Sequence, residues 1–141
     1  MKKRLLLLFL VVCSTLLFSH VHSQNAHLGL WKGSNQGQVG YISLDSLGYA
    51  FFVIEGDTVG GKSFMLEGHE VSMKYKIKYN ESHHHIDFII YLKNQNIEIS
   101  KLPGIFKFND DQSILLCINF DSEDRPSDFN EEDILTLRKV N

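Results

Sequence analysis

The chain has 141 residues, of which 43% are hydrophobic and 22% are charged, and its formal net charge is −3. This length suits one domain rather than two, and the negative charge argues against a nucleic-acid-binding protein. Ten Phe and five Tyr beside only two Pro are incompatible with an intrinsically disordered chain. Composition therefore predicts a single folded domain.

The first 23 residues have the features of a secretory signal peptide. Three basic residues at 2–4 precede an apolar run at 5–12, and Ser23 ends a plausible cleavage motif. The apolar run is shorter than the roughly 20 residues that a spanning helix needs, so we expect no membrane span. The pattern predicts export, periplasmic or extracellular, with lipid attachment at Cys13 as the alternative.

In this interpretation residues 24–141 are the mature domain. They carry a net charge of −6, because three of the 14 basic residues and none of the 17 acidic ones leave with the signal peptide. Cys117 is then the one remaining cysteine, so no intramolecular disulfide can form. Its apolar neighbours Leu116 and Ile118 favour a core residue over a reactive thiol.

Apolar and polar residues alternate with a period of two along residues 24–141. In the clearest run, at 71–78, apolar residues beginning at Val71 alternate with Ser72 and three lysines. Similar runs occur at 28–33, 39–44, 49–55, 63–67, 86–92, 97–100, 105–108, 114–120 and 135–138. Gly, Asn and Asp between the runs are turn formers. The pattern predicts an all-β fold, and we favour a barrel because closure removes exposed sheet edges.

Two regions resemble known barrels. The segment Gly29-Leu30-Trp31-Lys32-Gly33 is similar to the Gly-x-Trp opening of lipocalin-type proteins. The order of motifs at 104–108, 115–117, Asp124-Arg125-Pro126 and 135–139 resembles a family of small exported bacterial lipocalin-like (calycin-type) domains of unknown function. The resemblance covers most of 28–140 and implies an antiparallel up-and-down barrel, here of about 8–9 strands, without an assigned activity.

The resemblance also implies structural roles for single residues. Trp31 would close the floor of the barrel, with a basic residue of the last strand over its ring, which we expect to be Arg138. Arg125 would pair with a neighbouring carboxylate, and Pro126 would stiffen the long acidic loop. Calcium binding in that loop is disfavoured, because an EF-hand that began at Asp121 would place Pro126 where Gly is required.

One cluster of residues has the composition of a metal site. His83, His85 and Asp87 follow one another at i, i+2 and i+4, so a strand would place them on one face. Two imidazoles and a carboxylate can bind zinc, copper or non-haem iron, whereas the alternative is a hydrated strand end. No nucleophile elbow, phosphate loop or HExxH motif is present, so an enzyme is the less favoured class.

The expected lumen supplies the main functional hypothesis, which is a binding module for a small apolar ligand that needs no cofactor. Its candidate lining residues are Tyr49, Phe51, Val53, Met73, Tyr75, Phe88 and Ile90. The first alternative is a packed barrel that contacts a protein partner, and the second is a metal-dependent site. A cavity above about 300 Å³ would favour the binding module, whereas a filled lumen would favour the packed barrel that contacts a partner.

Overall fold

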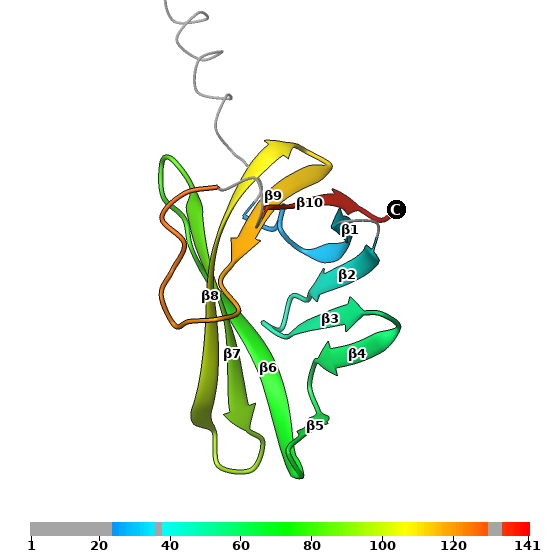
Figure 1. The fold of residues 1–141 in the computed structure, drawn as a ribbon, viewed down its shortest axis with the longest axis vertical. Coiled ribbons are helices and arrows are strands. Elements are labelled where there is room, and N and C mark those ends of the chain that lie inside the picture. Colours follow the sequence, from blue (N-terminus) through cyan, green and yellow to red (C-terminus); the bar gives the residue numbers. More distant parts are fainter. Residues whose placement is uncertain (1–23, 36–37, 130–133) are drawn as a thin grey trace, which may run out of the picture.

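The computed structural model describes residues 24–35, 38–129 and 134–141, which form a single curled sheet (Figure 1). The described residues contain ten strands and no helix. The strands are β1 (Gly29–Asn35), β2 (Gln38–Leu44), β3 (Ala50–Ile54), β4 (Asp57–Gly60), β5 (Phe64–Leu66), β6 (His69–Lys78), β7 (His84–Leu92), β8 (Ile97–Asp110), β9 (Ser113–Ile118) and β10 (Ile134–Lys139).

Some of the predictions concern residues outside these ranges. The expected signal peptide at 1–23, with Cys13, lies outside the described residues, as do the acidic residues at 131–133. Within the described ranges, no helix is long and apolar enough to cross a membrane.

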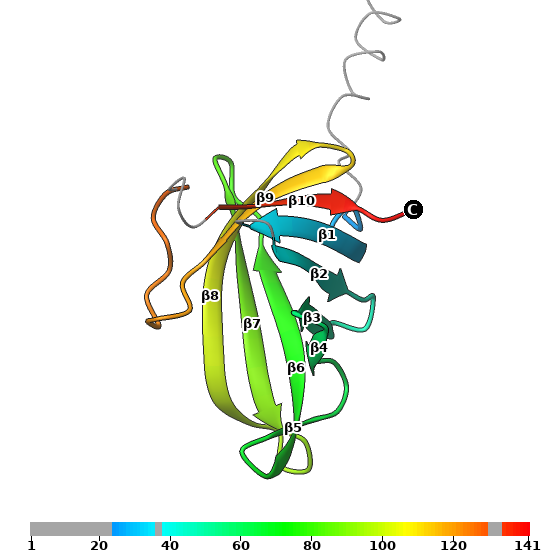
Figure 2. The ribbon, with the colours of Figure 1, turned by 45° about the vertical axis from the view of Figure 1, so that its right-hand side comes forward.

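The strands form an antiparallel barrel. Their order is β4-β3-β2-β1-β10-β9-β8-β7-β6-β5, so consecutive strands are neighbours except β4 and β5, which form the two edges, and β1 also pairs with β10. The first and last strands of the chain therefore lie side by side. Figures 1 and 2 show the sheet curling until β3 and β4 approach β6. The antiparallel barrel expected from the sequence is confirmed.

The barrel has ten strands rather than eight or nine. Glu55 and Gly56 have φ angles of 54° and 90°, as in the two-residue type I′ turn, so β3 reverses directly into β4, a strand that the sequence analysis missed. Conversely, the runs at 97–100 and 105–108 join into the single strand β8, which continues through Pro103.

A short seam brings the two ends of the sheet together. The backbone N–H of Met73 donates to the carbonyl oxygen of Gly61 at 2.9 Å, and that of Tyr75 donates to Gly48 at 2.9 Å. An isolated bridge pairs Tyr49 with Lys74. These few bonds join the β3–β4 side to β6, so the barrel is nearly closed.

The inner face of the barrel forms one hydrophobic core. Its buried side chains are Trp31, Ile42, Leu44, Ala50, Phe52, Val71, Met73, Ile86, Phe88, Ile90, Phe106, Ile114, Leu116, Ile118 and Leu137. Phe52 of β3 and Phe88 of β7 meet edge to face, with ring centroids 4.8 Å apart, although their strands do not pair. Side chains therefore fill the middle of the lumen.

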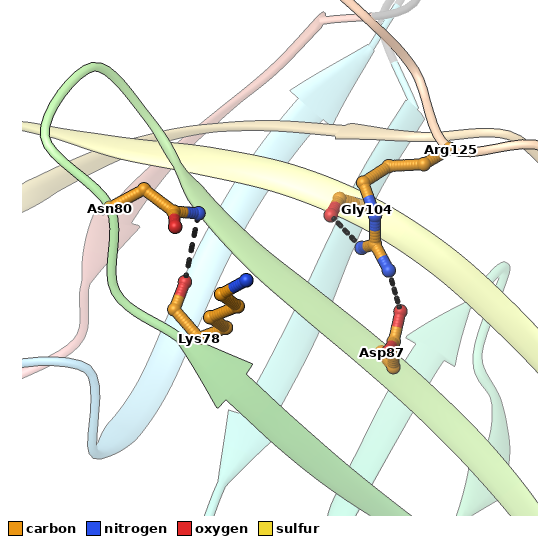
Figure 3. Close-up of polar contacts among 5 residues, drawn as sticks. All are labelled: Lys78, Asn80, Asp87, Gly104 and Arg125. Atoms are coloured by element: carbon orange, nitrogen blue, oxygen red, sulfur yellow. Dashed lines mark hydrogen bonds and ion pairs between the residues drawn. The ribbon is translucent and has the colours of Figure 1, made fainter.

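The loop between β9 and β10 is anchored to the outer face of the barrel. Arg125 donates from Nη1 to the carbonyl oxygen of Gly104 at 2.9 Å and from Nη2 to Oδ1 of Asp87 at 2.8 Å (Figure 3). Arg125 thus pairs with a carboxylate, as expected, but one from a distant strand. Cys117 borders the hollow beneath this loop and is buried, as predicted.

Candidate ligand-binding site at the barrel mouth

An apolar pocket opens at one end of the barrel, and we call it the mouth pocket. Its volume is about 180 Å³. The residues that line it are Gly33, Val39, Gly40, Tyr41, Ile42, Phe52, Val53, Ile54, Glu55, Ile118, Phe120, Leu135 and Leu137. In this set only Tyr41 and Glu55 have polar side chains, so the pocket suits an apolar group.

Two glycines explain why the wall is thin at this end. Gly33 of β1 and Gly40 of β2 lie directly opposite each other in the strand pair. Both belong to the inner face, because Trp31 and Ile42, two residues away, are part of the core. A Cβ added at Gly33 would lie 2.5 Å from a methyl group of Leu137. Leu137 therefore packs against bare backbone, and neither glycine fills the mouth.

Large apolar side chains surround the pocket and face solvent. Val39 is 49% exposed, Ile54 is 50% exposed and Phe120 is 59% exposed. All three border the same hollow, and they come from β2, β3 and the segment after β9. Exposed apolar groups that gather around a concave apolar site are typical of a binding surface.

The opposite end of the barrel, which we call the floor, is filled. Trp31 is completely buried there, and its Nε1–H donates to the carbonyl oxygen of His27 at 2.8 Å. The space that remains beside Trp31 and Leu116 is about 20 Å³, which is room for one water molecule. His27, which precedes β1, therefore packs against Trp31 at the floor. Trp31 itself lies at the end of the barrel that the resemblance implies for it.

His27 is bound at the floor by two tyrosines. The hydroxyl of Tyr75 donates to the carbonyl oxygen of Asp45 at 2.7 Å, which uses its only hydrogen. The 3.1 Å contact between His27 Nε2 and the same hydroxyl must then have Nε2–H as the donor. His27 Nδ1 is left to accept from the Tyr79 hydroxyl at 2.8 Å. Donor counting thus makes Nε2 a donor, and the Tyr79 hydroxyl lies closer to Nδ1 than to its other acceptor, the carbonyl oxygen of Gln24 at 3.5 Å. Together with the lowered pKa of His27, these contacts fit the neutral Nε2–H tautomer.

The surroundings of these groups oppose their charged forms. Burial lowers the pKa of His27 below 6.5, and the charge of Lys139 lowers it further. Burial raises the pKa of Tyr75 to about 12, with smaller contributions from Asp45 and Tyr79. The floor network is therefore built from neutral rings.

Lys139, and not Arg138, lies over Trp31. The Nζ atom of Lys139 is 5.2 Å from the Trp31 ring centroid, and it also donates to the carbonyl oxygen of Ala26 at 3.3 Å. Trp31 and Lys139 are opposite each other in the β1–β10 pair, so their side chains share the inner face. Arg138 is exposed, because strand alternation turns it to the outer face. The expectation for Arg138 was wrong by one residue.

The predicted lumen residues divide into two groups. Met73, Tyr75, Phe88 and Ile90 contact the core as expected, but they fill the lumen instead of lining a cavity. Tyr49, Phe51 and Val53 were assigned to the wrong face. Ala50 and Phe52 are the inward residues of this strand, and a one-residue shift reverses every side chain. Of the seven, only Val53 borders the mouth pocket.

The proposed metal ligands do not form a site. His83 and His85 lie near each other, with ring centroids 5.8 Å apart, but His83 precedes β7 and Asp87 is bound by Arg125. Across the described part of the chain, no three His, Cys, Asp or Glu residues are arranged to hold a metal ion. A hollow of about 360 Å³ beside Asp121, Asp128 and Arg125 is polar and also lacks such a group.

In comparisons with known proteins, no family model, no curated protein and no solved structure matches the chain. The molecule is thus defined by its fold and its pocket, as an antiparallel barrel with a filled floor and an apolar mouth. Most pocket residues were missed from sequence. The available signal was Gly33 and Gly40, which stand opposite each other if Asn35 pairs with Gln38.

Proposed function

We propose that this protein is a binding module that holds a small apolar ligand, or the apolar part of a larger one, in the mouth pocket. The observation that carries the proposal is an apolar hollow at the open end of a barrel whose interior is otherwise filled. A cavity of about 150 Å³ lined by aliphatic and aromatic side chains can hold benzene. A pocket of about 180 Å³ therefore fits a single ring or a short alkyl group.

The lumen is filled, and the pocket is smaller than the roughly 300 Å³ at which drug-sized ligands begin to fit. This size criterion does not favour a ligand held inside the barrel, so the proposed site is limited to the mouth. A larger ligand would keep its remainder outside, against the exposed side chains of Val39, Ile54 and Phe120. We place this module outside the cytoplasm, because the first 23 residues have the pattern of a signal peptide. A small lipocalin-like barrel is also what the motifs around Trp31 and Arg125 resemble.

The second candidate is a protein partner, and the exposed rim favours it. Val39, Ile54 and Phe120 offer enough apolar surface to surround one apolar side chain from another protein. Both candidates use the same pocket, so they differ in what fills it and not in where binding occurs. An enzyme is not proposed, because the candidate metal ligands are not assembled.

A neutral apolar fluorophore tests the proposal. N-phenyl-1-naphthylamine titrated into the purified protein should show increased fluorescence and saturate at one site. Ile54→Trp places a large ring at the rim of the pocket, where the native side chain is half exposed. If the Trp ring removes apolar contact area from the fluorophore equivalent to two methylene groups, its binding should weaken about tenfold.

Leu47→Trp is the matched control, because Leu47 is 67% exposed and lies in the turn between β2 and β3, outside the pocket. This variant should bind the fluorophore as the native protein does. The proposal is wrong if the native protein does not bind the fluorophore or if both Trp variants lose binding equally. Binding of the fluorophore without any effect of Ile54→Trp would place the site elsewhere.

A further inference from the structure

The outer face of β6 carries a row of lysines. Met73, Tyr75 and Ile77 contact the core, so strand alternation directs Lys74, Lys76 and Lys78 outward. Successive outward residues on a strand are about 6.8 Å apart. The three ammonium groups therefore form a line on the surface of the barrel.

Two further lysines extend this line sideways. Lys74 pairs with Ile89 of β7, and Ile89 pairs with Lys101 of β8, so all three belong to one outward-facing row. Lys62 precedes β5, and its Nζ lies 5.8 Å from the centroid of the Tyr49 ring, which Lys74 also approaches. We call Lys62, Lys74, Lys76, Lys78 and Lys101 the lysine face.

Tyrosines hold part of the lysine face in place. The Nζ atom of Lys74 lies 5.7 Å from the centroid of Tyr49 and 5.4 Å from that of Tyr91. Tyr49 thus contacts two ammonium groups, and Tyr91 contacts one. Single-stranded nucleic acids bind by stacking bases on open aromatic rings. Here the rings position positive charge, so the lysine face is suited to recognise charge without stacking.

Two carboxylates are in register with residues of the lysine face or its tyrosines, Asp87 opposite Lys76 and Glu98 opposite Tyr91. Within the described residues the ion pairs are Lys93–Glu70 and Arg125–Asp87, and neither involves the lysine face. Asp87, the cross-strand neighbour of Lys76, is thus already bound by Arg125. Burial lowers the pKa of His85, and so do the positive charges of Arg125, His83 and Lys78, with Asp87 opposing them. The local charge is therefore positive on a chain whose net charge is negative.

We propose that the lysine face docks this protein on a membrane surface that contains anionic lipids. Clusters of four to eight basic residues bind such surfaces, and each lysine strengthens partitioning about fivefold. Ile99 of β8, two residues before Lys101, is 44% exposed, as expected for a residue on the same outer face. Basic groups beside exposed aliphatic ones are suited to the boundary between headgroups and acyl chains. This proposal is independent of the ligand in the mouth pocket.

Vesicle co-sedimentation tests the proposal with the purified protein. Vesicles of phosphatidylcholine with 30% phosphatidylglycerol should bind the protein, vesicles of phosphatidylcholine alone should not, and added salt should weaken binding. The double variant Lys76→Gln/Lys78→Gln removes two exposed charges that make no cation–π contact with Tyr49 or Tyr91. Partitioning should fall about 25-fold.

Lys32→Gln/Arg138→Gln is the control, because it also removes two exposed positive charges. These two residues are cross-strand neighbours on β1 and β10, outside the lysine face. It should bind anionic vesicles nearly as the native protein does. Equal loss in both double variants, or equal binding to neutral vesicles, would overturn the proposal. So would tight binding of an oligothymidylate that Lys76→Gln/Lys78→Gln abolishes, because the lysine face would then recognise nucleic acid.

Discussion

The floor of this barrel is filled by buried, hydrogen-bonded side chains, whereas its mouth is an open apolar hollow. At the floor, Trp31 is completely buried and donates to the carbonyl oxygen of His27, whose ring contacts two tyrosine hydroxyls within hydrogen-bond distance. At the mouth, Gly33 and Gly40 leave a hollow of about 180 Å³, and Phe120 is 59% exposed beside it. The floor therefore buries its apolar groups and hydrogen-bonds its polar groups within the barrel, whereas the mouth exposes apolar surface that a ligand or partner could cover.

This difference separates stability from binding along the axis of the barrel. A fold that depends on a hydrophobic core can leave one end open only if the remaining interior is well filled. The edge-to-face pair of Phe52 and Phe88 fills the middle, and Trp31 fills the floor. Substitutions at the floor should therefore affect folding, whereas those at the mouth should affect binding with little change in stability.

The largest effect should follow from Trp31→Ala. Removing a fully buried indole leaves a cavity and deprives the carbonyl of His27 of its donor, so the free energy of unfolding should fall by about 3–5 kcal/mol. Phe120→Ala at the mouth should lower it by less than about 0.5 kcal/mol. Urea denaturation monitored by circular dichroism measures both. Similar losses in the two variants would remove the distinction between floor and mouth.

An intermediate effect should follow from Arg125→Ala, which tests whether the loop after β9 supports the barrel as the floor does. The guanidinium binds the carboxylate of Asp87 and the carbonyl of Gly104, with both charged side chains about one quarter exposed. Charged hydrogen bonds of this kind contribute about 1.5–3 kcal/mol, and partial exposure reduces the expected loss to about 1–2 kcal/mol.

Lys93→Ala is the control for Arg125→Ala. It breaks the ion pair with Glu70, in which both side chains are at least 40% exposed, so the loss of stability should be much smaller than that of Arg125→Ala. Urea denaturation at low ionic strength distinguishes the two variants. If Arg125→Ala is no more destabilising than Lys93→Ala, the loop does not contribute to the stability of the barrel.

The barrel could be predicted because the alternation of apolar and polar residues recurs in many separate runs along the sequence. Each run of alternating residues identifies a strand, and the turn formers between the runs separate them. The face of each strand is harder to predict, since a shift of one residue reverses it. At 71–77 charged residues mark the outer face, and the assignment was right. At 49–53 nearly every residue is apolar, so nothing in the pattern distinguished Phe51 from Phe52.

The site depends on pairings between strands, which a single sequence does not contain. Asp87 seemed available to a metal because its partner Arg125 lies 38 residues away. Lys139 reaches Trp31 because the β1–β10 register places the two residues opposite each other, and a shift of one residue would have favoured Arg138. The mouth pocket arises where Gly33 meets Gly40, so it too follows from register rather than from any local motif.

The smallest effect should come from the titration of His27, which is half buried at the floor. Because folding lowers its pKa below 6.5, the unfolded chain binds more protons near that pH. The contribution of neutral His27 to stability is therefore complete above pH 6.5, declines as the pH falls through 6.5 and levels off below the lowered folded value.

His27→Gln isolates this contribution. The Gln amide can donate to Tyr75 and its carbonyl can accept from Tyr79, so the hydrogen bonds of the neutral imidazole have replacements that do not titrate. The pKa of His85 is lowered as well, but that residue is present in both proteins. Urea denaturation between pH 5 and 7.5 should show native stability falling relative to His27→Gln as the pH decreases. If the two stability curves stay parallel, the floor tolerates a charged imidazole and does not depend on neutral rings.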